Sequence, residues 1–311
     1  MEIEANVIDG WHIDNDCIII DLPADFNMKA NLGYLERNRN ECMFEVENET
    51  VTRVIVVGET RHLVRLNVNE QNQMFVQFVN GIKTSKLDSA KVAAYIREWF
   101  DLNRDLTPFY EMASADPLLK GPVQNFYGLR VIGVPDLFEA LCWGILGQQI
   151  NLAFAYTLKK QFVEKYGDSI EWSGRKYWIF PSYEQIAQLT PDDLAEIKMT
   201  RRKSEFIIGI AQLMTSGELS KEKLLGLGSL KEAEKSLIKI RGIGPWTANY
   251  VLMRCLRFTS AFPIDDVGLH NSIKQVTAAE RKPSKEELMA FSAKWDPWQA
   301  YATFYLWRVN Y

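Results

Sequence analysis

The sequence predicts an α+β protein, with an antiparallel β-sheet domain at its N-terminus and a mainly helical remainder. Short segments rich in β-branched and aromatic residues, separated by Gly and Asn turn signals, fill the first ninety residues. From about residue 88, apolar residues recur at helical spacing instead. A chain of 311 residues, 47% of them apolar, is long enough for two domains. We therefore expect a β-rich domain over 1–100 and a helical domain over 101–311.

The expected strands are 51–57, 62–68 and 74–79. The second and third alternate apolar and polar residues, which is typical of an antiparallel sheet with one face in water. A helix follows within 88–102, because its apolar residues fall on one face: Val92, Ile96, Trp99 and Phe100.

The remaining elements are predicted to be helices, several of which begin at an N-terminal signal such as Pro or Asp. One helix starts at Pro135-Asp136 and another at Pro191. Two helices flank a hairpin at 237–247. The other expected helices cover 151–166, 202–214, 265–276, 284–295 and 298–308. Residues 168–180 are expected to form an irregular insertion.

Composition limits the cellular context. No apolar run is long enough to span a bilayer, and residues 1–5 are acidic and lack the basic start of a signal peptide. We therefore expect a cytoplasmic protein, associated with the nucleoid in a bacterium. The four cysteines are far apart and show neither a disulfide pattern nor metal-ligand spacing, so no iron–sulfur cluster is expected: Cys17, Cys42, Cys142 and Cys255.

The net charge of -4 counts against a generic nucleic-acid-binding protein. The local charge differs, because residues 221–257 carry eight basic and three acidic side chains, and residues 198–203 add a second basic cluster. Phosphate binding responds to the local field, so an acidic total does not exclude a DNA-binding face.

The segment 237–248 reads as a helix, a glycine turn and a second helix. Gly242 and Gly244 permit a tight turn and close approach of a ligand, and Pro245 suits the first position of a helix. The free amides of that helix start, which include that of Thr247, form an anion site that fits a phosphate. Lys239 and Arg241 add positive charge nearby. Gly-X-Gly alone would favour an ordinary turn between packed helices.

Two carboxylates follow where another helix should begin. Asp265 is expected to be the N-cap of this helix, a common position for Asp. Asp266 would then stand beside the hairpin, and backbone amides and the helix dipole favour its ionised form. The simpler alternative is that both residues only cap the helix.

These motifs together resemble the helix-hairpin-helix (HhH-GPD) DNA glycosylases, and most closely the 3-methyladenine-DNA glycosylase II branch. Segments 137–151, 202–213 and 295–307 are similar to helices of that family in the same order, so the resemblance spans about 136–308. It implies a pair of helical subdomains with the active site in the cleft between them, preceded by a β-rich region.

The resemblance also implies roles for single residues. The essential carboxylate of the family corresponds to Asp266. Members that cut the DNA strand carry a Schiff-base lysine at the hairpin exit, where this chain has Trp246, so hydrolysis of the base alone is implied. Trp246, Tyr250 and Trp307 would form an aromatic pocket that favours a cationic base, although aromatic residues at helical spacing are most often core.

Further implied contacts concern DNA and a cation. Gln149 stands, after Gln148, where close relatives often have a gap-filling leucine, and an amide there can also bond an unpaired base. The carbonyl groups of Ile238, Ile240 and Ile243 would hold a monovalent cation, Na⁺ or K⁺, and no other cofactor is expected.

The favoured hypothesis is thus a monomeric, monofunctional glycosylase that removes flipped-out alkylated purines, such as 3-methyladenine, from damaged double-stranded DNA in base-excision repair. A second hypothesis keeps the reaction and changes the substrate to an oxidised or deaminated purine, such as 8-oxoguanine or hypoxanthine. A third is a non-catalytic hairpin protein that only grips DNA. A metal-dependent nuclease is disfavoured, because no acidic or His cluster has ligand spacing.

Overall fold

The computed structural model describes residues 10–82 and 84–310, so the segment 1–5 used to argue against a signal peptide lies outside it. A six-stranded antiparallel sheet forms the N-terminal part, in the order β1-β2-β6-β5-β4-β3. Its strands are β1 (Trp11–Asp14), β2 (Cys17–Asp21), β3 (Glu45–Glu47), β4 (Thr50–Val57), β5 (Thr60–Val68) and β6 (Gln73–Phe78). The three predicted strands are confirmed as β4, β5 and β6. Strands β1, β2 and β3 were not predicted, because three to five residues are too few to show a clear pattern.

Both faces of the sheet are covered, at least in part. Helix α2 (Lys86–Trp99), capped by Ser85, packs on one face through the apolar side predicted for it. On the other face, β7 (Asp168–Trp172) and β8 (Arg175–Ile179) form a hairpin against β4. There Val54 and Leu63 meet Tyr177 in a small apolar cluster. The face of the sheet that we expected to be exposed to solvent is therefore buried where the hairpin packs on it.

The prediction of an irregular insertion at 168–180 is wrong. Ser173 and Gly174 both have positive φ, at 49° and 75°, which is the backbone that a two-residue hairpin turn requires. Apolar residues alternate on either side of the turn and gain burial against the sheet, which a reading of the isolated segment did not consider.

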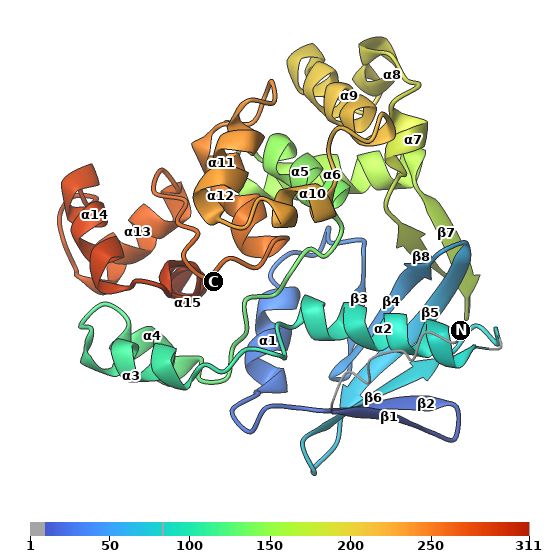
Figure 1. Ribbon diagram of the computed structural model, residues 1–311, viewed down its shortest axis with the longest axis horizontal. Helices are drawn as coiled ribbons and strands as arrows, with labels where there is room; N and C mark the ends of the chain where they lie inside the picture. Colours follow the sequence, from blue (N-terminus) through green and yellow to red (C-terminus); the bar gives the residue numbers. More distant parts are fainter. Residues whose placement is uncertain (1–9, 83, 311) are drawn as a thin grey trace.

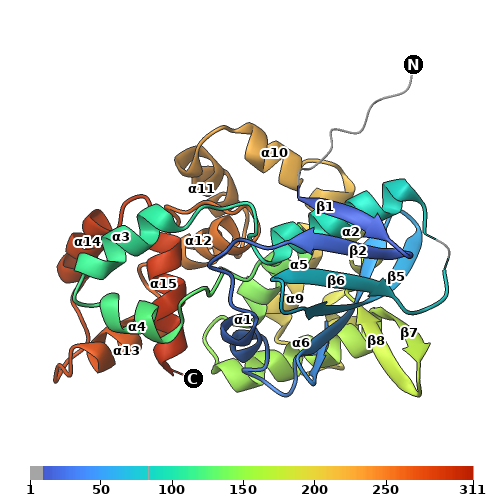
Figure 2. The same ribbon diagram turned by 90° about the horizontal axis from the view of Figure 1, so that it is seen from below.

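The rest of the chain is helical, as predicted, and wraps around one side of the sheet (Figures 1 and 2). The helices are α1 (Met28–Leu35), α3 (Thr107–Ala115), α4 (Lys120–Asn125), α5 (Leu137–Leu146), α6 (Leu152–Tyr166), α7 (Tyr183–Ile186), α8 (Pro191–Ala195), α9 (Arg201–Thr215), α10 (Lys221–Gly226), α11 (Leu230–Ile238), α12 (Pro245–Arg254), α13 (Val267–Val276), α14 (Lys285–Lys294) and α15 (Gln299–Trp307). In both views α3 and α4 lie beside α13–α15, from which they are distant in sequence. Among residues 10–82 and 84–310, no helix is long and apolar enough to cross a membrane.

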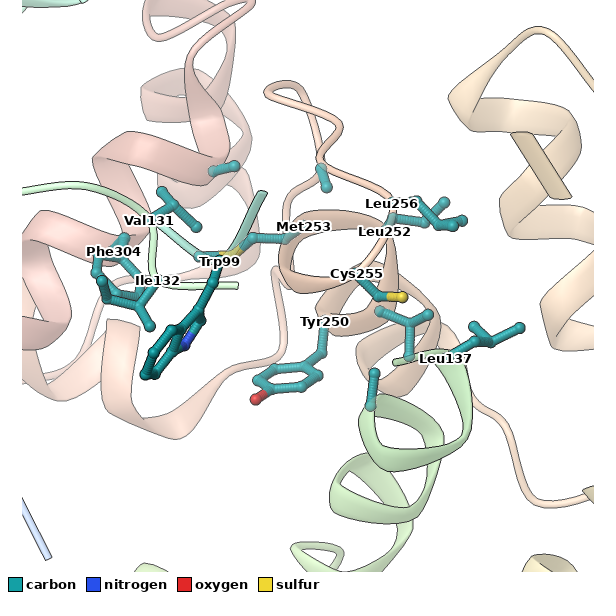
Figure 3. Close-up of a cluster of buried hydrophobic side chains, with 14 of the residues drawn as sticks. Trp99, Val131, Ile132, Leu137, Tyr250, Leu252, Met253, Cys255, Leu256 and Phe304 are labelled. Carbon is teal, nitrogen blue, oxygen red and sulfur yellow. The ribbon is translucent and has the colours of Figure 1, made fainter. Parts of the chain in front are cut away.

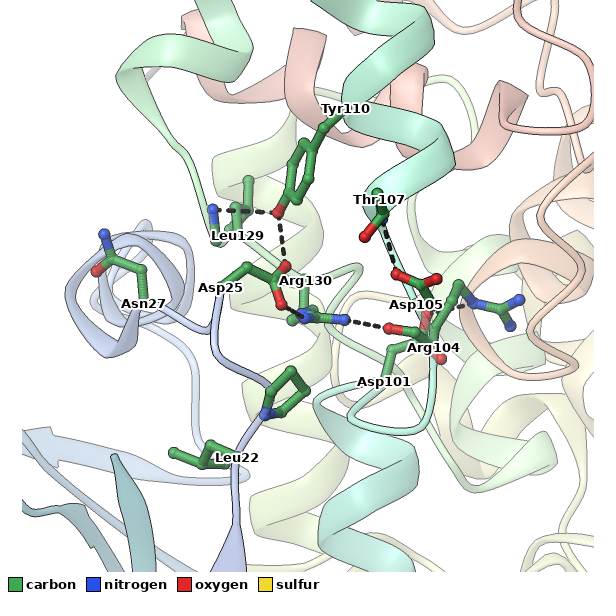
Figure 4. A network of polar contacts seen from close by, with 12 residues as sticks. Leu22, Asp25, Asn27, Asp101, Arg104, Asp105, Thr107, Tyr110, Leu129 and Arg130 are labelled. Carbon is green, nitrogen blue, oxygen red and sulfur yellow. Dashed lines mark hydrogen bonds and ion pairs between the residues drawn. The ribbon is translucent and has the colours of Figure 1, made fainter. Parts of the chain in front are cut away.

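A buried polar network joins the segment between β2 and α1 to the helical part (Figure 4). Asp25 accepts hydrogen bonds from Arg130 Nη2 at 2.5 Å and from the Tyr110 hydroxyl at 3.0 Å. Arg130 is fully buried, and its other terminal nitrogen donates to the carbonyl of Arg104 at 2.7 Å. Because a buried charge is costly without partners, these bonds hold the connecting segments in one arrangement.

Helix α12 sits at the centre of the molecule. Its buried residues pack against Trp99 of α2, Phe304 of α15, and Ile132 in the segment before α5 (Figure 3). On another side α12 touches α5 so closely that a Cβ on Gly144 would lie 2.6 Å from Thr247 Cγ2. A helix packed against several elements has few alternative positions, so residues on its exposed end are held rigidly.

Candidate active site

The hairpin forms between α11 and α12, as predicted. Gly242 has φ +97°, and a Cβ there would lie 2.3 Å from Cγ of Phe206. Only glycine satisfies both the left-handed backbone and the close approach to α9. Gly244 is the N-cap of α12 and Pro245 its first residue, in agreement with the sequence pattern.

The start of α12 is open to a ligand. Gly244 provides no side-chain cap among the described residues, and a Cβ on it would meet no atom within 4 Å. A surface depression of about 660 Å³ lies over this point, lined by Gln148, Arg202, Phe206, 241–247 and Asp265. Backbone amides at an uncapped helix start, facing a hollow, can bind an anion.

Two predicted contact residues also support the hairpin itself. Gln148 Nε2 donates to the carbonyl of Gly242 at 2.9 Å and to Thr247 Oγ1 at 3.2 Å. Thr247 is 1% exposed, and its hydroxyl is engaged with Gln148, so its side chain supports the hairpin from within. Gln149 is exposed at the tip of the loop between α5 and α6 with φ +57°, a strained backbone for a non-glycine residue.

The basic cluster at 221–257 does not all face the hollow. Lys239 and Arg241 are exposed, and Arg241 pairs with Glu205 of α9 at 2.9 Å. By contrast Arg254 is 4% exposed, while Arg257 and Lys221 form ion pairs with Asp101 and Glu98. These three side chains have partners elsewhere in the protein and do not line the hollow beside the hairpin.

Asp266 lies at the start of α13 and receives three hydrogen bonds. Trp246 Nε1 donates to its Oδ2 at 2.8 Å, and Trp307 Nε1 donates to its Oδ1 at 2.8 Å. The backbone amide of Leu269 donates to Oδ1 at 2.7 Å, which makes Asp266 the N-cap. The assignment of this cap to Asp265 was therefore wrong. Asp265 is exposed, because the helix begins one residue later than the sequence suggested.

These residues line a cleft of about 900 Å³ between α12, α13, α15, α1 and the α5–α6 loop. Asp266, Trp246, Tyr250 and Trp307, the predicted catalytic and pocket residues, all border it, together with Gln148 and Gln149. Trp246 and Tyr250 stack with centroids 5.7 Å apart at 24°, as their spacing on one helix face predicts. The volume is sufficient for a purine base and its sugar.

The inner end of the cleft contains residues that the sequence analysis missed. Tyr34 from α1 and the segment after it reach the cleft, as do Trp143 and Arg254. Tyr34 lies outside the recognisable motifs, so no local signal could have identified it. Arg254 follows Tyr250 by four residues, and this helical spacing was a signal that could have been used.

Other polar groups have structural partners. His270 Nε2 lies 2.7 Å from the carbonyl of Ile264, so this ring helps to hold the chain before α13, as a packed histidine would. Within the part of the chain that the structure describes, no three His, Cys, Asp or Glu side chains are grouped as metal ligands.

Each half of the chain matches a known protein family. Residues 142–297 match the family described as "HhH-GPD superfamily base excision DNA repair protein", and residues 19–141 match "8-oxoguanine DNA glycosylase, N-terminal domain". A protein of Bacillus subtilis (strain 168) named DNA-3-methyladenine glycosylase is 66% identical over 97% of this chain and 99% of its own.

Solved structures share the fold. A 3-methyladenine DNA-glycosylase from Archaeoglobus fulgidus superposes with a TM-score of 0.79 at 24% identity, covering 94% of this chain and 97% of its own. A Clostridium acetobutylicum 8-oxoguanine glycosylase/lyase, bound to double-stranded DNA, gives a TM-score of 0.75 at 21% identity, covering 96% of both chains.

Proposed function

The chain belongs to the HhH-GPD superfamily of base-excision DNA repair proteins, and we propose that it is a DNA glycosylase that hydrolyses the N-glycosidic bond of alkylated purines such as 3-methyladenine. The observation that carries this proposal is the Asp266 carboxylate, held at the wall of a purine-sized cleft next to the hairpin. A protein that only binds DNA has no need of a carboxylate fixed in this way.

The aromatic wall suits a flipped, positively charged base. Alkylation of a purine ring nitrogen gives the base a positive charge and weakens its bond to the sugar. A cation over the face of an indole gains about 0.5–2 kcal/mol. The stacked pair of Trp246 and Tyr250 offers such a face within the cleft. Flipping the nucleotide out of the DNA duplex costs less free energy when its base is damaged and poorly paired.

The carboxylate would act on the sugar. As the bond between C1′ and the base nitrogen breaks, its electron pair leaves with the base and positive charge develops on the sugar, which Asp266 stabilises. Water then adds to C1′ and loses a proton to Asp266 or to solvent. An ionised carboxylate has about four acceptor positions. The indoles and the Leu269 amide use two on Oδ1 and one on Oδ2. The remaining position on Oδ2 is the one that can face the sugar or the water.

We propose further that the enzyme removes the base without cutting the strand. A lyase forms an imine through an amine, whereas position 246 is a tryptophan and the described residues that line the cleft include no lysine. Borohydride added to the protein with damaged duplex DNA is therefore expected to trap no covalent complex, measured on a denaturing gel. A trapped wild-type protein would overturn this assignment, and a known glycosylase/lyase serves as the positive control.

The hairpin would hold the damaged strand of one DNA duplex per monomer. Its open amides and the exposed Lys239 and Arg241 are placed to contact a phosphate. Gln149, exposed at the loop tip on the edge of the cleft, would fill the space left by the flipped base. We propose that it acts on chromosomal DNA in the cytoplasm, associated with the nucleoid in a bacterium.

We also propose that a monovalent cation binds the hairpin carbonyl groups of Ile238, Ile240 and Ile243. The Ile240 carbonyl accepts the Ile243 amide at 3.0 Å and retains a second lone pair. Neutral carbonyl oxygens suit Na⁺ or K⁺ better than metals that need acidic or imidazole ligands. DNA affinity is expected to be higher in KCl than in tetramethylammonium chloride at equal ionic strength. Equal affinities would remove the cation from the proposal.

A panel of duplexes, each with one modified base, tests the function. After incubation and cleavage with hot alkali, strand breaks in excess of those in enzyme-free duplex are expected at 3-methyladenine and 7-methylguanine. Breaks at 8-oxoguanine alone would favour the second hypothesis, to which the match of residues 19–141 gives some weight. Breaks at hypoxanthine alone would point to deaminated purines. Tight binding without any break would indicate a non-catalytic protein.

A further inference from the structure

The inner end of the cleft is built by residues from two distant parts of the chain. Tyr34 of α1, Tyr250 and Arg254 of α12 are 2%, 4% and 4% exposed. All three border both the cleft and a small inner cavity of about 40 Å³ behind it. Together with Arg37 and Trp143, which also border both spaces, they form the partition between the two, and we call Tyr34, Tyr250 and Arg254 the floor of the cleft.

Arg254 organises this floor. Its Nη1 donates to the hydroxyl oxygen of Tyr34 at 2.6 Å and to that of Tyr250 at 3.3 Å, and its Nε donates to the carbonyl of Ile132. Its guanidinium carbon lies 5.3 Å from the ring of Tyr34 and 5.4 Å from those of Tyr250 and Phe304. The charge is thus held in an aromatic enclosure, with its hydrogen bonds aimed at the two phenols.

The direction of these bonds decides what the floor can offer a ligand. Each phenol oxygen accepts a hydrogen bond from Arg254, so each hydroxyl hydrogen remains to be donated elsewhere. Among residues 10–82 and 84–310, neither hydrogen has a protein acceptor. Burial raises the pKa of Tyr250 to about 12, so its hydroxyl keeps this hydrogen at neutral pH. In Figure 3 the hydroxyl of Tyr250 points away from its own helix.

Such a floor matches the acceptor atoms of a base. A purine that enters the cleft with its sugar beside Asp266 turns its six-membered ring away from the sugar, toward the inner end. Guanine-derived bases carry a carbonyl acceptor at C6, whereas adenine-derived bases carry an amino donor there. A site that donates hydrogen bonds therefore binds guanine-derived bases more strongly than adenine-derived bases.

We propose that Tyr34 and Tyr250, oriented by Arg254, read the C6 edge of the flipped purine and accelerate release of bases with a carbonyl at C6, while contributing little to release of bases with an amino group there. This inference rests on the proposed glycosylase function. Tyr34 and Tyr250 would touch the base directly, and Arg254 would be a positioning residue behind them. The positive charge of Arg254 would also stabilise the electron density that the carbonyl gains as the base departs.

The test compares 7-methylguanine and 7-methyladenine in methylated duplex DNA, with the released bases measured by chromatography. Both bases are cations methylated at the same nitrogen, and they differ at C6 and in the 2-amino group. Tyr34→Phe and Tyr250→Phe keep the rings and remove the hydroxyls. Each variant is expected to lower kcat/KM for 7-methylguanine roughly three- to tenfold, the effect of one hydrogen bond, and to change that for 7-methyladenine less than about twofold.

The matched control is Tyr305→Phe, because the Tyr305 hydroxyl is also buried and donates to the carbonyl of Leu129 but does not border the cleft. It is expected to lower the melting temperature without changing the ratio of the two rates. Competition by the free bases with the wild-type protein is a second measurement that needs no variant, and 7-methylguanine is expected to inhibit more strongly than 7-methyladenine.

Equal losses on both substrates would mean that the hydroxyls only support the fold, and this would overturn the inference while leaving the glycosylase function intact. Unchanged rates would mean that the hydroxyls donate to water in the inner cavity, and would overturn it as well. A wild-type protein that releases neither base would instead contradict the proposed function, and the role of the floor would fall with it.

Discussion

Replacing Asp266 with Asn is expected to slow base release by roughly 10²–10⁴-fold, the range for loss of a charged group that acts in the transition state. The amide has nearly the same size but cannot stabilise the positive charge that develops on the sugar. DNA affinity should change little, because the hairpin that would grip the phosphate is untouched. Single-turnover base release and equilibrium binding to the same duplex separate the two effects.

The structure indicates that this variant will fold. Asn is as good an N-cap as Asp, and its oxygen can keep the hydrogen bonds from the Leu269 amide and the Trp307 indole. Its amino group would then face the indole N–H of Trp246, which loses its acceptor. The expected cost is about 1–3 kcal/mol of stability at most, too little to account for the loss of activity.

Asp265→Asn is the matched control, because the two carboxylates are adjacent and Asp265 is exposed and does not cap the helix. We expect its rate to stay within about threefold of wild type, as for most surface substitutions. If Asp266→Asn kept the wild-type rate, or if Asp265→Asn lost as much, the assignment of the catalytic carboxylate would be wrong.

Gly242→Ala is expected to destabilise the protein by about 2–5 kcal/mol, the sum of left-handed backbone strain and overpacking. Its φ is +97°, and the new methyl group would lie 2.3 Å from Cγ of Phe206. Either the turn or α9 must move. Urea unfolding measures the change, and DNA affinity should fall with it because the turn loses its shape. A variant as stable as wild type would show that the turn is not under this constraint.

Gly244→Ala separates the grip on DNA from the fold. Gly244 has φ −93°, and a Cβ on it would meet no protein atom within 4 Å. Stability should therefore stay within about 0.5 kcal/mol of wild type. Because the methyl group would occupy the space in which a phosphate approaches the open amides, DNA affinity is expected to fall roughly tenfold, as for loss of about one hydrogen bond to a charged group. Fluorescence anisotropy at constant salt measures it. An unchanged affinity would argue against phosphate binding at this turn.

Asp265 and Asp266 show which features of the site could be predicted from the sequence and which could not. The motif placed a carboxylate beside the hairpin, and Asp266 lies there. Which of the two residues caps α13 depended on where the helix begins, and the expectation was wrong by one residue. Helix ends are set by competition among nearby hydrogen-bond partners. Here the indoles of Trp246 and Trp307, from two other helices, hold the carboxylate of Asp266.

Local sequence alone determined most of the helices, the central strands, the glycine turn and the placement of Trp246 and Tyr250 on one face, whereas α1, α3, α4, α7 and α10 were not predicted individually. Each depends on backbone conformation or periodicity within about a dozen residues, and such preferences are visible in the chain itself. Only the tertiary structure decided that 168–179 folds onto the sheet and that Tyr34 meets Arg254, 220 residues away. The reason is that burial and the pairing of buried polar groups depend on which distant surfaces meet, and no local pattern records that choice.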